Sequence, residues 1–138
     1  MQLRQSGHPY IDVIHDYYLG CNTGDVVHYF VDHSKVVGAA AIANYWAKVG
    51  PMTQAHWTLD HCVVQEPEAV IEWTMQWTPP QTGEFELLRG SEWYLFHGER
   101  IREIRSYHCN HYLQDPANRE LRDFDYAARG YPSELTER

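Results

Sequence analysis

The chain has 138 residues, of which 43% are hydrophobic and 14% aromatic, and its formal net charge is −8. This length suits one domain with its own core, and so much apolar content excludes a globally disordered chain. A nucleic-acid partner is excluded because it requires a basic surface, and no run of Lys and Arg offsets the acidic balance. No stretch approaches the roughly 18 continuous apolar residues of a membrane span, so no membrane association is expected.

Targeting signals and cysteine usage favour a cytoplasmic location. The first ten residues lack the apolar core of a signal peptide. The three cysteines, Cys21, Cys62 and Cys109, are odd in number and show no metal-ligand spacing. They are therefore expected to be reduced thiols.

The first part of the chain has mainly helical periodicity. Apolar residues at helical spacing predict a helix over 9–20, closed by a turn over 21–25. The β-branched and aromatic run from Val27 to Val31 predicts a short strand. Gly38 then opens a second amphipathic helix, which is expected to stop at Gly50-Pro51.

From His56 onward the periodicity is alternating. Four strands are predicted, over 56–65, 69–78, 85–96 and 101–113, with turns between them. Helices first and hairpin-linked strands afterwards indicate an α+β fold with an antiparallel sheet.

The C-terminal stretch, about 114–138, is expected to be an extension of the domain. Asp115-Pro116 predicts the start of a short helix that ends near Phe124. Phe124, Tyr126 and Tyr131 make this stretch too aromatic for a solvated tail. It is expected to pack over a pocket mouth or against a dimer partner, and the sequence leaves both open.

Several short motifs occur in a characteristic order. They are Tyr17-Tyr18 with Asn22-Thr23-Gly24-Asp25, Gly38 before Ala41-Ile42-Ala43, Ile71-Glu72-Trp73-Thr74, Arg89-Gly90-Ser91-Glu92-Trp93-Tyr94, and Ile101 to Tyr107. In this order the chain resembles the SnoaL-like branch of the nuclear transport factor 2 superfamily, which includes ketosteroid isomerase, polyketide cyclases and scytalone dehydratase. The resemblance implies one domain over 1–138, a cone-shaped α+β barrel whose curved antiparallel sheet packs on N-terminal helices around a central pocket.

Two candidate catalytic residues follow from the resemblance. Tyr17 stands seven residues before Gly24, as does the oxyanion-donating tyrosine of ketosteroid isomerase. Glu92 stands four residues before Phe96, at the position of the acid that serves ketosteroid isomerase as second donor and SnoaL-like cyclases as general acid/base.

Strand alternation supports the same role for Glu92. If Gly90, Glu92, Tyr94 and Phe96 face inward, the carboxyl lies among aromatic rings, and burial raises its pKa toward neutrality. The alternative is that Glu92 faces solvent or pairs with an arginine such as Arg89 or Arg105.

The sequence also departs from these relatives. The aspartate base of ketosteroid isomerase falls on Tyr29 here, and Asp32 lies three residues further on. Steroid isomerisation is therefore not predicted. The segment between Gly24 and Val27 is short, because the family usually places a pocket-closing helix there.

Nine histidines are a further signal of acid–base chemistry. By resemblance to scytalone dehydratase, His56 and His108 are candidate proton carriers. His56 and His61 differ in strand parity, so at most one of them faces the pocket unless a bulge intervenes. His108 and His111 would point to opposite faces of a strand, so no metal site is expected, and no cofactor motif is present.

We therefore expect a cofactor-independent lyase or isomerase, either a cyclase, an isomerase or a dehydratase, that binds a small apolar or aromatic molecule. Its substrate would carry a carbonyl or hydroxyl group. The catalytic candidates are Glu92, Tyr17, His108, His56 and Asp32. The expected pocket walls are Trp46, Trp57, Trp73, Tyr94, Phe96 and Tyr29.

Two alternatives stay open at this point. The apolar stripe of Ile71, Trp73, Met75 and Trp77 fits either the core or a dimer contact, and a homodimer is implied by the resemblance. A non-catalytic ligand-binding or dimerisation module is the rival function, because a fold alone does not imply a reaction.

Overall fold

The computed structural model describes residues 8–17, 19–108 and 121–131, in which one curved sheet packs against two helices. The strands are β1 (Asn22–Phe30), β2 (Val36–Val37), β3 (His56–Gln65), β4 (Glu68–Trp77), β5 (Glu86–His97) and β6 (Arg100–Tyr107). Their order across the sheet is β2-β1-β6-β5-β4-β3. Neighbours are antiparallel except β1 and β6, which are parallel. The α+β class is confirmed, with one parallel pair that was not predicted.

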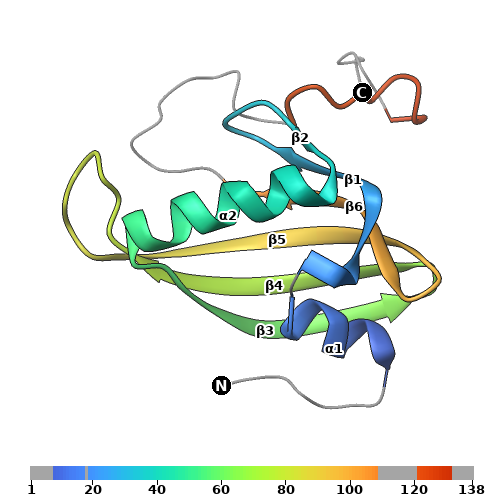
Figure 1. Cartoon of the computed structure of the whole chain (residues 1–138), viewed down its shortest axis with the longest axis horizontal. Coiled ribbons are helices and arrows are strands. Elements are labelled where there is room, and N and C mark those ends of the chain that lie inside the picture. Colours follow the sequence, from blue (N-terminus) through green and yellow to red (C-terminus); the bar gives the residue numbers. More distant parts are fainter. Residues whose placement is uncertain (1–7, 18, 109–120, 132–138) are drawn as a thin grey trace, which may run out of the picture.

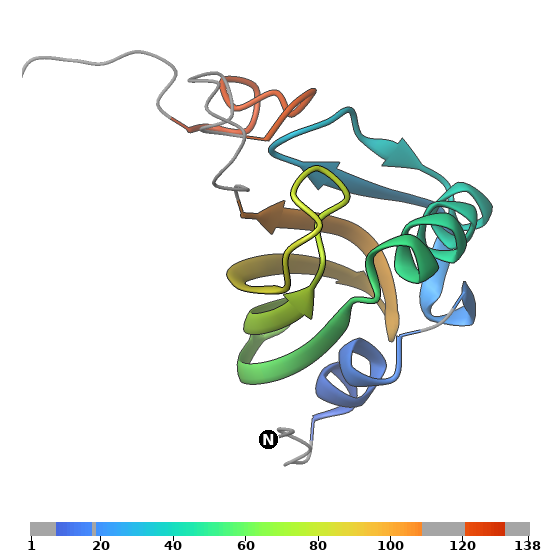
Figure 2. The same ribbon diagram turned by 90° about the vertical axis from the view of Figure 1, so that its left-hand side faces the viewer.

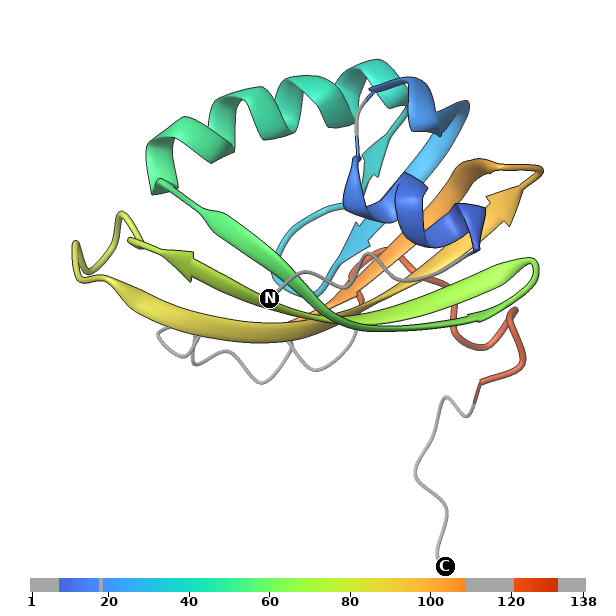
Figure 3. The same ribbon diagram turned by 90° about the horizontal axis from the view of Figure 1, so that it is seen from below.

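Both helices lie on the concave face of the sheet (Figures 1 and 3). Helix α1 (Pro9–His15) begins with proline at its first position, and His8 Nδ1 accepts a hydrogen bond from the Tyr10 backbone N–H at 3.1 Å. It is shorter than the predicted helix over 9–20. A 3₁₀ turn, η1 (Leu19–Cys21), leads into β1. Helix α2 (Ala39–Thr53) spans the length of the concave face.

Helix α2 runs through Pro51 to Thr53, so the predicted stop at Gly50-Pro51 is wrong. Proline removes one backbone N–H, and with it the bond to the carbonyl four residues earlier, that of Ala47. Ala47 is exposed, so water can replace this bond. The helix ends at Gln54, whose left-handed backbone lets its N–H donate to the Gly50 carbonyl at 3.1 Å.

The strand predictions hold best where alternation is regular. β3, β4 and β5 lie within one residue of the predicted ranges. β1 begins at Asn22 rather than Val27. Residues 22–25, which were predicted as part of a turn, extend the strand through an irregular pairing with β6. β6 ends at Tyr107, short of the predicted residue 113, and most of the predicted helix from Asp115 lies outside the described residues.

The main core fills the space between the helices and the concave face, which curls strongly from β3 round to β1 (Figure 2). The stripe Ile71, Trp73, Met75 and Trp77 is buried in this core, so the open choice between core and dimer contact is decided for the core. The Tyr10 ring stacks on the Phe96 ring at 3.6 Å and anchors α1 to β5.

A second, smaller cluster lies on the opposite face of the sheet, where residues 121–131 cover β1 and β6. Leu121 and Phe124 pack against Val31, and the Arg122 backbone N–H donates to the Phe30 carbonyl at 2.8 Å. Arg129 donates to both oxygens of Glu103, at 3.0 and 3.1 Å. The described part of the aromatic C-terminal stretch, residues 121–131, therefore packs on the outer face of the sheet rather than over the pocket mouth.

Candidate functional site

A cavity of about 430 Å³ lies between the concave face of the sheet and the two helices. Its walls are mostly apolar and aromatic, and its polar groups come from two tyrosines, a threonine, a glutamate and two histidines. The lining residues are Ile14, His15, Tyr17, His28, Trp46, Gly50, Trp57, Thr58, Leu59, Ile71, Trp73, Glu92, Tyr94 and Ile104. A pocket of this size and composition suits a small, largely apolar molecule.

A smaller hollow of about 110 Å³ adjoins this cavity. The two spaces share four lining residues, Trp46, Trp57, Trp73 and Glu92. Asp32, His33, Tyr45 and His108 are among the residues that line the small hollow alone. Glu92 therefore stands at the junction of a large apolar space and a small, more polar one.

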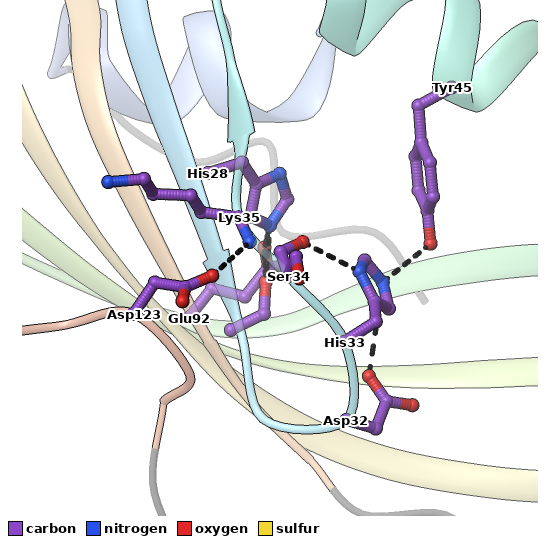
Figure 4. Close-up of polar contacts among 9 residues, drawn as sticks. His28, Asp32, His33, Ser34, Lys35, Tyr45, Glu92 and Asp123 are labelled. Carbon is purple, nitrogen blue, oxygen red and sulfur yellow. Dashed lines mark hydrogen bonds and ion pairs between the residues drawn. The ribbon is translucent and has the colours of Figure 1, made fainter.

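Two buried side chains lie beside the Glu92 carboxyl, Ser106 of β6 and His28 of β1; Figure 4 shows His28 next to Glu92. Ser106 Oγ donates a hydrogen bond to Glu92 Oε2 at 2.7 Å, and the distance from His28 Nε2 to Ser106 Oγ is 2.6 Å. His28 Nε2 is 3.7 Å from the same carboxyl oxygen. The sheet register explains this arrangement, because Glu92 on β5 faces Ser106 on β6, and His28 lies on β1 next to β6.

The proton positions in this group follow from the available donors. Ser106 has one hydroxyl hydrogen, which goes to Glu92, so His28 Nε2 carries the hydrogen that Ser106 Oγ accepts. His28 is then neutral, with its hydrogen on Nε2. Burial lowers the pKa of His28 to about 3, so this imidazole does not supply a positive charge near pH 7.

Burial is the main reason that the pKa of Glu92 rises to about 7, against an opposing effect of the Ser106 hydrogen bond. The side chain is only 15% exposed. Neither arginine considered as a partner reaches it, because Arg89 donates to Thr74 and Arg105 pairs with Glu103 on the outer face. A carboxyl that is half protonated near neutrality can both take and give a proton.

Tyr17 lines the large cavity together with Glu92. Its hydroxyl oxygen accepts a hydrogen bond from Asn22 Nδ2 at 2.9 Å, which fixes the phenol and leaves its own hydrogen for another acceptor. Burial raises the pKa of Tyr17 to about 12, so the phenol is protonated at neutral pH and can donate.

The polar residues of the small hollow form their own network (Figure 4). His33 Nδ1 is 2.9 Å from the Ser34 carbonyl oxygen, which can only accept, so Nδ1 carries the hydrogen. His33 Nε2 therefore accepts from the Tyr45 hydroxyl at 3.0 Å. Asp32 Oδ1 lies 3.9 Å from His33 Nε2. Burial lowers the pKa of His108, whose ring meets the Trp73 ring edge-on at 5.5 Å.

The structure brings most of the predicted site residues together. Glu92, Tyr17, Trp46, Trp57, Trp73 and Tyr94 line the large cavity, and Asp32 and His108 line the small hollow.

Three predicted residues lie elsewhere. His56 is exposed on β3 and lines neither space; a bulge at Asp60 does interrupt the strand, but His61 is exposed as well. Phe96 stacks in the core against α1, and Tyr29 packs on the outer face against Phe124 at 5.1 Å. Strand alternation places Tyr29 on the face opposite to His28, which is why it misses the pocket.

Sequence reasoning did not find Ser106 as a partner of Glu92. His28 and Ser106 are 78 residues apart in the chain, and only the parallel pairing of β1 with β6 brings them together. A signal was present, because Ser106 is a lone small polar residue at an inward position of a strand, two residues after the buried Ile104.

Within the described residues, no group of three or more His, Cys, Asp or Glu side chains is placed to hold a metal ion. None of the helices in this part of the chain is long and apolar enough to cross a membrane.

Comparison with known proteins places this geometry in a known fold. The family model for the SnoaL-like domain matches residues 16–104. No curated protein sequence matches the chain.

Solved structures show the same architecture. A protein of unknown function with a cystatin-like fold from Methylobium petroleophilum PM1 is 31% identical, with a TM-score of 0.77; the match covers 94% of this chain and 95% of that chain. A protein from Mesorhizobium loti labelled a SnoaL-like polyketide cyclase is 17% identical, with a TM-score of 0.63 and coverage of 72% and 92%. A nuclear transport factor 2-like protein of unknown function from Cytophaga hutchinsonii ATCC 33406 is 22% identical, with a TM-score of 0.57 and coverage of 64% and 80%.

Proposed function

The chain belongs to the SnoaL-like domain family, and we propose that it is an enzyme that moves protons on a small, largely apolar molecule bound in the large cavity. One observation carries the proposal. Glu92 lines that cavity, is buried without a charged partner among the described residues, and has a pKa of about 7. An isolated buried carboxyl is costly for a fold, and a value near the working pH is what a general acid/base requires.

Glu92 would act through its free oxygen. The Ser106 hydroxyl and the nearby imidazole of His28 both approach Oε2. Oε1 is therefore the atom that would exchange a proton with the substrate. When the carboxylate takes a proton from a carbon next to a carbonyl, the C–H bond breaks, an O–H bond forms on Oε1, and the electron pair moves to the carbonyl oxygen. Returning the proton to another carbon completes an isomerisation. In a dehydration, Oε1 gives the proton to a hydroxyl group on the next carbon, the C–O bond breaks, water leaves, and the enolate electron pair forms the C=C bond.

Tyr17 would stabilise the negative charge on that oxygen. Its phenol is protonated at neutral pH, is held by Asn22, and lines the same cavity as Glu92. A fixed donor of this kind lowers the barrier because it interacts more strongly with the enolate than with the neutral carbonyl. This division of roles agrees with the one implied by the sequence resemblance.

Proton exchange at carbon tests the proposal without knowledge of the natural substrate. Enolisable ketones such as 2-tetralone are incubated with the protein in D₂O at pH 7, and the loss of α-hydrogen signal is followed by ¹H NMR. We expect exchange above the buffer rate, and a fall of about 10²-fold or more in Glu92→Gln. Tyr17→Phe should lower the rate to a smaller extent.

The matched control is Glu72→Gln. It makes the same chemical change at an exposed position of β4, and it should exchange at the wild-type rate. Equal rates for Glu92→Gln and wild type would refute the assignment of Glu92. Ketone binding, seen as a change in Trp fluorescence, with no exchange above buffer would instead favour the non-catalytic ligand-binding module.

A further inference from the structure

Two residues that line the small hollow carry hydrogen-bond donors that pair with nothing among the described residues. The Nε1 atoms of Trp73 and Trp77 are buried and have no hydrogen-bond partner among the described residues. Both side chains are more than nine-tenths buried and both residues line the small hollow. An indole N–H can only donate, and a buried donor without an acceptor destabilises a fold. His108 Nδ1, from a third residue of this hollow, is buried without a partner as well.

No acceptor among the described residues, the Asp32 and Glu92 carboxyl groups of the hollow included, makes a hydrogen bond to either indole N–H. The Tyr45 hydroxyl donates to His33, and His33 in turn donates to the Ser34 carbonyl. The Ser106 hydroxyl is held between His28 and Glu92. A bound molecule would supply the acceptor that the described residues do not offer to the two indole groups.

The charges around the hollow select the kind of acceptor. Two carboxyl side chains, Asp32 and Glu92, are among its lining residues, and no Lys or Arg is among the described ones. An anionic oxygen would be repelled by these carboxyl groups, whereas a neutral carbonyl or ether oxygen would not.

The size of the hollow limits what accompanies that oxygen. Its volume of about 110 Å³ is smaller than the roughly 150 Å³ of an apolar cavity that accepts benzene. It has room for an acyl or methoxy group. The adjoining cavity of about 430 Å³ has room for a ring system, and Glu92 lines both spaces.

We propose that the small hollow is a subsite for a neutral oxygen acceptor carried on the substrate's ring system, bound by the indole N–H groups of Trp73 and Trp77. The substrate would thus carry two oxygen-bearing groups, one that reacts beside Tyr17 in the large cavity and one that is held in the small hollow. The reading of the ligand as a substrate rests on the proposed function, whereas the binding site itself does not.

Three probes with the same ring system separate the alternatives. They are 2-acetylnaphthalene, which has a neutral carbonyl, 2-isopropenylnaphthalene, in which a CH₂ group replaces that oxygen, and 2-naphthoate, which is anionic. Affinity is measured at pH 7 by calorimetry or Trp fluorescence, and the indole N–H signals are followed by ¹H–¹⁵N NMR. We expect the ketone to bind about tenfold more tightly than the hydrocarbon and than the anion. Only the ketone should move the Trp73 and Trp77 indole signals downfield.

Trp77→Phe tests the donor directly because it keeps an aromatic ring and removes the N–H. It should reduce the ketone preference to about twofold or less, and Trp73→Phe provides a second test. The matched control is Trp93→Phe, because Trp93 is 38% exposed and lines neither space; it should keep the tenfold preference.

Equal affinity for the ketone and the hydrocarbon would overturn the subsite, as would tightest binding of the anion or unchanged indole signals in the ketone complex. Failure of all three probes to bind would also count against it. The same titrations in Glu92→Gln keep the two proposals apart. Selective binding without any proton exchange in the wild type would refute the enzyme and keep the subsite. Proton exchange without oxygen-selective binding would refute the subsite and keep the enzyme.

Discussion

Replacing Glu92 with glutamine should change how the stability of the protein depends on pH. Folding raises the pKa of Glu92 from 4.5 to about 7. Between these values the unfolded chain has lost the proton and the folded chain still holds it, so the unfolded state binds fewer protons and the free energy of unfolding falls as pH rises. Each pH unit in this interval is worth about 1.4 kcal/mol, so the full loss by pH 8 is about 3 kcal/mol. The side chain is only 15% exposed, so solvent screening reduces this figure little.

The wild-type curve alone would hide this effect because His28 has the opposite one. The pKa of His28 falls from 6.5 to about 3 on folding. Between these values the unfolded state holds a proton that the folded state lacks, so the free energy of unfolding rises with pH. The two slopes oppose each other from about pH 4.5 to 6.5. The informative quantity is therefore the difference between the variant and the wild type at each pH.

Urea unfolding at pH 5, 6, 7 and 8 measures that difference. We expect Glu92→Gln to gain stability relative to the wild type as pH rises, by about 2 to 3 kcal/mol over this range. The control variant Glu72→Gln should run parallel to the wild type, because its side chain is exposed. Parallel curves for Glu92→Gln as well would show that the Glu92 carboxyl titrates normally, and both the burial argument and the proposed proton transfer would fail.

Two further predictions concern the residues around Glu92. Ser106→Ala should raise the pKa of Glu92 above its value of about 7, because the serine hydrogen bond favours the carboxylate. The titration is measured by ¹³C NMR of the labelled Glu92 carboxyl. Ser106→Thr keeps a hydroxyl group and should shift the pKa of Glu92 less. Gly90→Ala should destabilise the fold by about 1–3 kcal/mol and displace the Trp73 ring, because the added Cβ would lie 2.7 Å from Cε2 of Trp73. An unchanged unfolding midpoint in urea would contradict this prediction.

The fold could be predicted well where local patterns decide it. The alternation of β3 to β5 gave strand bounds within one residue, and it grouped Glu92 with Tyr94 on one face of β5, which faces the large cavity in the structure. The end of α2 could not be predicted in this way. A proline usually stops a helix, but near the last turn it removes a single bond whose acceptor faces water.

The site was predicted less completely, because part of it depends on contacts between distant segments. His28 looks like any polar residue on a half-buried strand until β1 is placed beside β6. His56 and Tyr29 were expected in the pocket because of residue type and family position, yet the face of a strand is set by register. Tyr29 lies one residue from His28 and so points to the other side of the sheet.

The parallel pairing of β1 with β6 also has a consequence for the order of folding. A ribosome makes β1 and its short partner β2 early, yet β1 can join the rest of the sheet only after residues 100–107 have been made. Closing so long a loop is slow, so hairpins β3–β4 and β4–β5 are expected to form first and β1 to dock late. His28 reaches Ser106 only in that final step, which means that a nascent or truncated chain can hold most of its sheet and still lack the assembled carboxyl site.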